Sequence, residues 1–185
     1  MILPMHDDEL TAFLDALDQT PPDAPTRCAR WSAHDLLAHM VAGTEEMARL
    51  AELAAAGRTD EPTRPFAARE APWRTCPDPE LRIAFFEVGG RFLAALDALP
   101  AGQLVPFTGW AMSVEQLRTH ARSELVLHRW DLVGDDDISA RLLDQPDLIA
   151  HGRAVLAAMP TLAEARRAPR ADDDLLSLWG RVLDA

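Results

Sequence analysis

Three side chains in this sequence have the types and spacing of a metal site. Glu124 and His128 are four residues apart in the segment SELVLHRWDLVG, and His39 lies in the earlier segment RWSAHDLLAHMVAG. Residues four apart on a helix share one face, with Cβ atoms about 5–6 Å apart. Two imidazoles and a carboxylate suit a catalytic Zn²⁺ or another divalent first-row ion. Taken alone, a Glu-x3-His pair on a helix is more often a local hydrogen-bonded pair than a metal site, so the pattern leaves both interpretations open.

Two residues beside His128 extend this candidate site. Asp131 follows three residues later and is predicted to accept a hydrogen bond that orients the imidazole, although a carboxylate near a helix end is often only a surface charge. Arg129 is a candidate for holding a substrate carboxylate, with a surface charge again as the alternative. No catalytic side chain is assigned, because neither Cys28 nor Cys76 has a base recognisable in the sequence.

Two predicted helices position the three candidate ligands. Residues 113–133 begin with a capping-box pattern, Ser113 and Gln116, and their apolar stripe includes Glu124 and His128. A buried carboxylate must be protonated, paired or bound to a metal. Residues 32–57 form the second helix, which has an apolar stripe with His39 at its edge. The patterning therefore directs all three polar side chains toward the interior.

The rest of the chain also has the periodicity of helices. We expect further helices over 6–20, 78–99 and 146–159, and a short one in the segment DDDLLSLWGRVLD. The region 58–77 contains four prolines and is predicted to be a loop, and no alternating pattern indicates a strand. These expectations describe an all-α protein, a four-helix bundle with short additional C-terminal helices.

Composition excludes several classes of partner and location. The net charge is −12 and the pI about 4.8, so nucleic acid and anionic membrane surfaces are not expected partners. No apolar run approaches the roughly 20 residues of a membrane span, and the N-terminus lacks the order of a signal peptide. With only two cysteines, we expect a cytoplasmic protein in a reducing compartment.

Two segments together resemble one protein family. RWSAHDLLAHMVAGTEEMARL is similar to the pattern Trp-Ser/Thr-x-x-Asp-Leu-Leu-x-His-Leu of the DinB-like, mycothiol-dependent maleylpyruvate isomerase family, and SELVLHRWDLVG resembles its later pattern Glu-x3-His-x-Trp-Asp. The resemblance implies a DinB-like four-helix bundle in which His39, Glu124 and His128 bind a divalent metal, with Zn²⁺ as the expected ion. It assigns residues 1–160 to the metal-binding bundle and residues 161–185 to a short extension, a remnant of the family's second domain.

The same resemblance implies a function. In such enzymes the metal activates the sulfur of a small thiol, here mycothiol, for addition to a small electrophile, so we expect an isomerase or S-transferase. The absence of Lys, Asn and Tyr is typical of a high-GC gene, which agrees with mycothiol as the thiol. The alternative is a non-catalytic metal- or ligand-binding stress or regulatory protein on the same bundle. A homodimer is compatible with either function.

Overall fold

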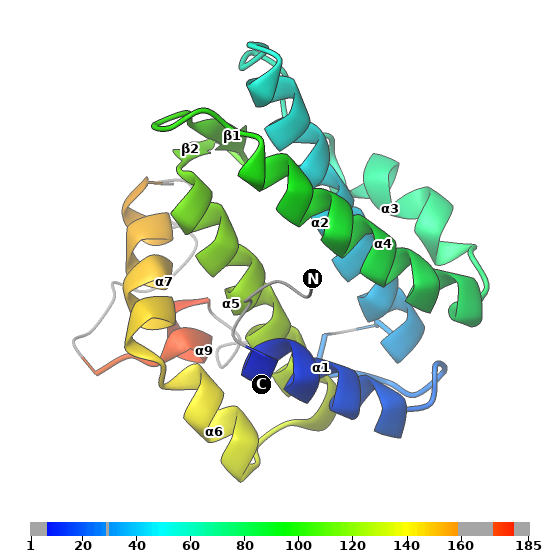
Figure 1. Cartoon of the computed structure of the whole chain (residues 1–185). Helices are drawn as coiled ribbons and strands as arrows, with labels where there is room; N and C mark the ends of the chain where they lie inside the picture. Colours follow the sequence, from blue (N-terminus) through cyan, green and yellow to red (C-terminus); the bar gives the residue numbers. More distant parts are fainter. Residues whose placement is uncertain (1–6, 29, 159–171, 180–185) are drawn as a thin grey trace. The chain divides into compact units, whose positions relative to one another are not determined.

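The structure is a computed structural model that describes residues 7–28, 30–158 and 172–179. It is all-α apart from one short hairpin, as predicted for a DinB-like chain (Figure 1). The chain divides into two compact units, which we describe separately. Unit 1 comprises residues 1–21 and 119–185, and unit 2 comprises residues 22–118. Within the described residues no helix is long and apolar enough to cross a membrane.

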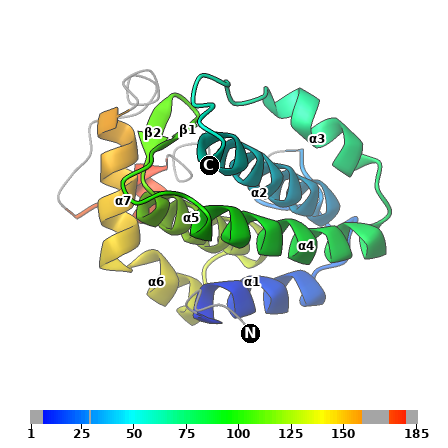
Figure 2. The same ribbon diagram turned by 45° about the horizontal axis from the view of Figure 1, so that its top comes forward.

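Unit 2 is built around α2 (Ala33–Ala55). Helices α3 (Phe66–Arg74) and α4 (Asp78–Asp97) both lie alongside it (Figures 1 and 2). The predicted capping box at the start of α2 is present, since Ser32 Oγ accepts from the amide of Asp35 and the Asp35 carboxylate accepts from the amide of Ser32. Both α2 and α4 bury an apolar stripe, which consists of Leu36, Leu37, Met40, Val41, Met47, Leu81, Phe85, Val88, Phe92 and Leu96.

The prediction that residues 58–77 form only a loop is wrong, because α3 occupies half of that segment. Pro72 lies inside this helix and removes one backbone donor. Side chains of α3 nevertheless bond to α2: Trp73 Nε1 donates to Glu45 Oε2 at 3.2 Å, and Arg74 and Glu70 make the contacts described below. Tertiary contacts therefore stabilise a helix that proline content argues against.

The expectation of no strands is also wrong, although only by a small hairpin. Strands β1 (Val105–Phe107) and β2 (Trp110–Met112) pair antiparallel, with Val105 opposite Met112. Thr108 and Gly109 between them both have positive φ, as the tightest hairpin turns require. Strands of three residues are too short to show a recognisable alternation in the sequence.

Unit 1 contains α1 (Asp7–Gln19), most of α5 (Val114–Val133), α6 (Asp137–Leu143), α7 (Pro146–Ala158) and α9 (Leu175–Leu178). Helix α6 was not predicted; it is capped by Asp136, whose side chain accepts from the amide of Ser139. One apolar core joins these helices and consists of Ala12, Val126, Leu127, Leu142, Leu143, Leu148, Leu175 and Leu176. Of the predicted extension 161–185, only residues 172–179 are among the described residues.

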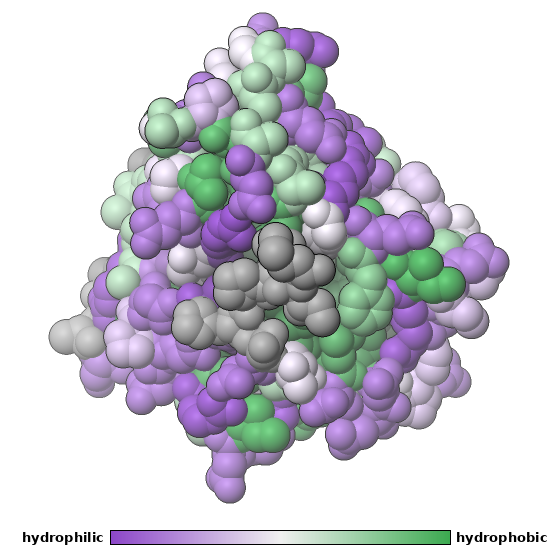
Figure 3. Space-filling model, in the orientation of Figure 1, coloured by the Kyte–Doolittle hydropathy of each residue, from purple (hydrophilic) through white to green (hydrophobic). Residues whose placement is uncertain are grey.

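The surface agrees with the acidic composition. Hydrophilic residues cover most of the coloured surface in the view of Figure 3, with smaller apolar areas between them. The large apolar side chains that are exposed include Phe66, Ile83 and Phe86. Exposed apolar side chains are ordinary on folded proteins.

Candidate metal centre

Helix α5 brings Glu124 and His128 together in unit 1, as their spacing predicts. Nε2 of His128 lies 3.4 Å from Oε2 of Glu124, and the His128 side chain is only 2% exposed. The Glu124 side chain is 22% exposed, so this carboxylate lies at the boundary of the interior. An imidazole nitrogen and a carboxylate oxygen this close can share a proton or a cation.

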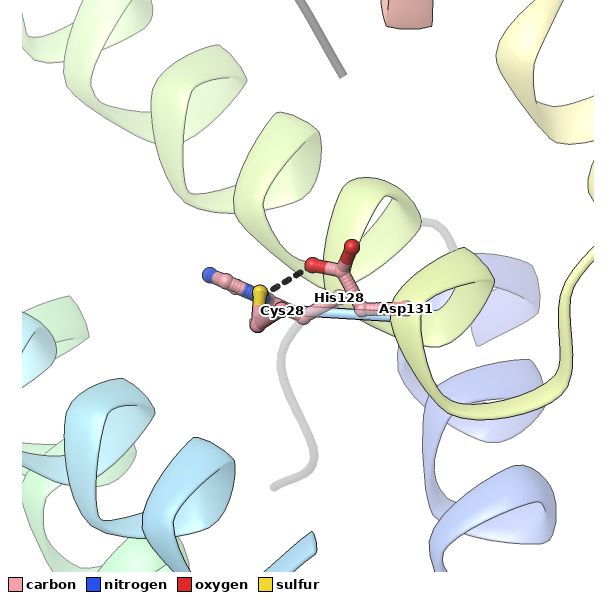
Figure 4. Close-up of side chains that lie close together, drawn as sticks. All are labelled: Cys28, His128 and Asp131. Carbon is pink, nitrogen blue, oxygen red and sulfur yellow. Dashed lines mark hydrogen bonds and ion pairs between the residues drawn. The ribbon is translucent and has the colours of Figure 1, made fainter. Parts of the chain in front are cut away.

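Asp131 holds the other nitrogen of the same imidazole. Its Oδ2 lies 2.9 Å from Nδ1 of His128, and both side chains are buried (Figure 4). A carboxylate can only accept, so the geometry favours a proton on Nδ1 and directs Nε2 toward Glu124. The predicted contact is present, whereas its role in orienting a metal ligand stays a prediction.

His39 lies on α2 in unit 2. The carboxylate of Glu70 contacts its Nδ1, as Asp131 contacts Nδ1 of His128. Nδ1 of His39 lies 2.7 Å from Oε1 of Glu70, with side chains 13% and 6% exposed. Glu70 belongs to α3, and no pattern selected it as a site residue, because its segment was predicted to be a loop. The placement of His39 with Glu124 and His128 around one ion stays a prediction.

Glu70 is itself fixed by Arg74. Nε and Nη2 of Arg74 donate to Oε2 of Glu70 at 3.1 and 2.8 Å, and Nη1 donates to Oδ1 of Asp35 at 2.6 Å. Burial would raise the pKa of Glu70, but hydrogen bonds from His39 and Arg74 outweigh it and lower that pKa. Glu70 is therefore charged near neutral pH and can attract the proton on Nδ1 of His39.

Aromatic rings surround the imidazole of His39. The centroid of Trp31 lies 4.9 Å from that of His39, and the ring of Phe66 stacks on it at 5.7 Å. The guanidinium of Arg74 lies 5.1 Å from the ring centroid of Trp31. Trp31 and Phe66 therefore pack against His39, and apolar side chains around an imidazole strengthen its electrostatic interactions.

Arg129, the candidate substrate contact, is buried and binds residues of its own unit. Its Nη1 and Nη2 donate to the two carboxylate oxygens of Asp136 at 2.9 and 2.8 Å, and Nη1 also donates to Ser139 Oγ. The hydrogen bonds from Arg129 hold the pKa of Asp136 well below its usual range. This guanidinium ties α5 to the start of α6, so the predicted substrate contact is not part of the function proposed below.

A pair of histidines lies next to Glu124 and was given no role from the sequence. Nδ1 of His120 lies 3.2 Å from Nε2 of His151 on α7, and Nε2 of His120 lies 3.9 Å from Oε1 of Glu124. Burial, followed by the neighbouring His120, lowers the pKa of His151 to about 4. His151 is therefore neutral near pH 7. His120 lies about one helical turn before Glu124, but His151 is 31 residues away from it on another helix, so no pattern in the sequence joined the pair.

The protein is thus all-α in fold, and it pairs imidazole with carboxylate groups of the kinds that bind metal ions. The sequence profile of the mycothiol maleylpyruvate isomerase N-terminal domain matches residues 4–133, more than half of the chain. The protein therefore belongs to that family. No curated protein and no solved structure matches the chain significantly.

Proposed function

We propose that the protein is a divalent-metal-dependent enzyme that uses a small thiol of the mycothiol type to isomerise, or transfer sulfur to, a small electrophile. The metal ligands are His39, Glu124 and His128, and the metal is Zn²⁺. The observation that supports this proposal most is the matching arrangement of the two imidazoles. Each has Nδ1 against a buried carboxylate of its own unit, which makes Nε2 the nitrogen for a metal.

The residues fit the proposed ion. Neutral imidazole and carboxylate are the ligands of catalytic zinc sites, which use three protein groups and keep a further position for water or substrate. The Glu124 carboxylate already lies beside Nε2 of His128, the arrangement that two ligands of one ion need. Bound zinc would supply the stabilisation of a thiolate near neutral pH.

The chain's own residues would prepare the ligands for this chemistry. Asp131 and Glu70 hold the protons of the imidazoles on Nδ1 and increase the basicity of Nε2. Trp31 and Phe66 pack against the ring of His39 and restrict its position. Cys28 and Cys76 do not form a disulfide, which agrees with a reducing, cytoplasmic location for a thiol-dependent reaction.

Metal analysis of the purified protein tests the proposal, with His39→Ala and Glu124→Gln as site variants. We expect one zinc per chain in the wild type and its loss in both variants. A wild type that binds no divalent metal would refute the proposal. Consumption of mycothiol with a panel of small electrophiles then tests the reaction.

The second candidate is a metal- or ligand-binding protein without catalysis. It is favoured by the contacts of Arg129, the candidate substrate contact, which binds Asp136 within its own unit. Stoichiometric zinc with no thiol consumption for any electrophile would select this candidate.

A further inference from the structure

We infer that Glu70 is the positioning residue of His39, and that a four-residue ladder between α2 and α3 fixes it in that role. The inference rests on the proposed function, because it assigns His39 as a metal ligand. Glu70 does not touch the metal or the reacting groups in this scheme. It acts through His39, whose Nδ1 lies 2.7 Å from Glu70 Oε1.

The ladder consists of two pairs of residues, each four apart on its helix. Asp35 and His39 lie on α2, and Glu70 and Arg74 lie on α3. Asp35 pairs with Arg74 at 2.6 Å while His39 pairs with Glu70 at 2.7 Å, so the two helices run antiparallel at this contact. A shift of one helix along the other would break both pairs together, which fixes their register.

The two oxygens of Glu70 have separate partners. Arg74 donates from both Nε and Nη2 to the same oxygen, Oε2. This contact turns Oε1 toward Nδ1 of His39. The far end of the ladder is equally fixed, because Asp35 accepts from the backbone amide and the hydroxyl of Ser32 at 3.1 and 3.0 Å.

This arrangement selects one form of the neutral imidazole. The carboxylate accepts a hydrogen bond only from a protonated Nδ1, so the neutral ring of His39 must carry its proton there and not on Nε2. Phe66 stacks on the ring and Trp31 flanks it, which restricts its rotation. Glu70 therefore determines both the nitrogen that binds the metal and the direction in which that nitrogen points.

Two measurements on Glu70→Ala and Glu70→Gln test the inference. The first is long-range ¹H–¹⁵N NMR of the His39 ring in metal-free protein at mildly alkaline pH. We expect the Nδ1–H form in the wild type and a shift toward Nε2–H in Glu70→Ala. The second is zinc affinity by competition with a chelator, where we expect a loss of about 10–100-fold for Glu70→Ala and a smaller one for Glu70→Gln.

Glu87→Gln is the matched control, because Glu87 is an exposed glutamate on α4. It should change neither the ring nor the zinc affinity. Glu70→Gln keeps the shape and an acceptor oxygen, so it remains informative if Glu70→Ala does not fold.

The outcomes separate this inference from the proposed function. If folded Glu70 variants have the zinc affinity of the wild type and keep the His39 proton on Nδ1, the inference is overturned and the metal site is unaffected. If the wild type binds no zinc, the proposed function is refuted. If the position of the His39 proton nevertheless changes in the Glu70 variants, the inference that Glu70 positions His39 is upheld. A wild-type ring with its proton on Nε2 would overturn the inference whether or not zinc binds.

Discussion

The two histidines proposed as ligands have the same kind of partner, but the chain provides it in different ways. Asp131 lies three residues after His128 on the same helix, so helix geometry alone brings it to Nδ1. Glu70 is separated from His39 by 31 residues and comes from another helix. The first pair needs only that α5 is helical. The second needs α3 to form and to remain beside α2, so it depends on everything that holds α3.

Glu46 should be the position where this dependence is greatest. Its buried carboxylate accepts from Arg49 at 2.6 and 3.0 Å, and from the backbone and side-chain nitrogens of Arg64, two residues before α3. We expect Glu46→Gln to lower the free energy of unfolding by about 3 kcal/mol, since it leaves two guanidinium groups without their shared charge. Urea denaturation measures this loss, and hydrogen exchange should show α3 opening while α5 stays protected.

The exposed pair Arg58–Glu61 provides the control. Glu61→Gln should have almost no effect on stability. Equal exchange rates for α3 in Glu46→Gln and wild type would contradict the dependence of α3 on this anchor.

His151 in unit 1 and Glu46 in unit 2 should respond to acid over different pH ranges. The pKa of His151 falls to about 4 in the folded protein, because the imidazole is buried beside His120. The unfolded chain then binds more protons between pH 6.5 and about 4, so stability falls as pH drops through this range, by at most about 3 kcal/mol. His151→Gln should flatten this part of the stability profile measured by urea denaturation.

Glu46 in unit 2 acts at lower pH. Burial would raise its pKa, but hydrogen bonds from Arg49 and Arg64 outweigh burial and lower it to about 2. The charged Glu46 carboxylate stabilises the folded state fully above about pH 4.5, and this contribution is lost as pH falls toward 2. A profile for His151→Gln that is identical to wild type between pH 6.5 and 4.5 would refute the separation of the two ranges.

Asp131→Asn should weaken zinc binding by about 10–100-fold, because the amide no longer supplies a negative charge to Nδ1 of His128. Helix geometry should remain, so the far-UV circular dichroism of the variant is expected to match wild type. Chelator competition measures the affinity, and Asp144→Asn, at an exposed aspartate, is the control. Undiminished affinity would show that the intrahelical carboxylate is dispensable.

Arg74→Gln should have the smallest effect. It removes the grip on Glu70 and the link to Asp35, but the Arg74 side chain is 31% exposed and solvent screens these ion pairs. We expect a loss of about 1 kcal/mol in stability and a zinc affinity a few-fold lower. An effect on zinc affinity equal to that of Glu70→Ala would show that Arg74, and not Glu70 alone, determines the position of His39.

The long helices could be predicted from the sequence, and so could the part of the candidate site that lies on α5 alone. Capping boxes at Ser32 and Ser113 are both present, since such caps depend on residues three apart. The contacts of Glu124 and Asp131 with His128 follow from helical spacing in the same way. Local patterns predict local contacts.

Contacts between distant segments were not predictable. Helix α3 was missed because its stability comes from bonds to α2 that outweigh the effect of Pro72, and Glu70 was missed with it. Arg129 illustrates the converse. Its type and position suggested a ligand contact, but a carboxylate seven residues later, which no helical period indicates, binds its guanidinium.

The ladder between α2 and α3 has a consequence for comparing relatives of this protein. Asp131 keeps a constant distance from His128 in any relative that retains the helix, so a pattern search can find its equivalent. The carboxylate that serves His39 has no such fixed distance, because insertions or deletions between residues 56 and 65 would move it in an alignment without moving it in space. Its equivalent in a relative is better identified by an acidic residue followed four positions later by arginine than by a column of the alignment.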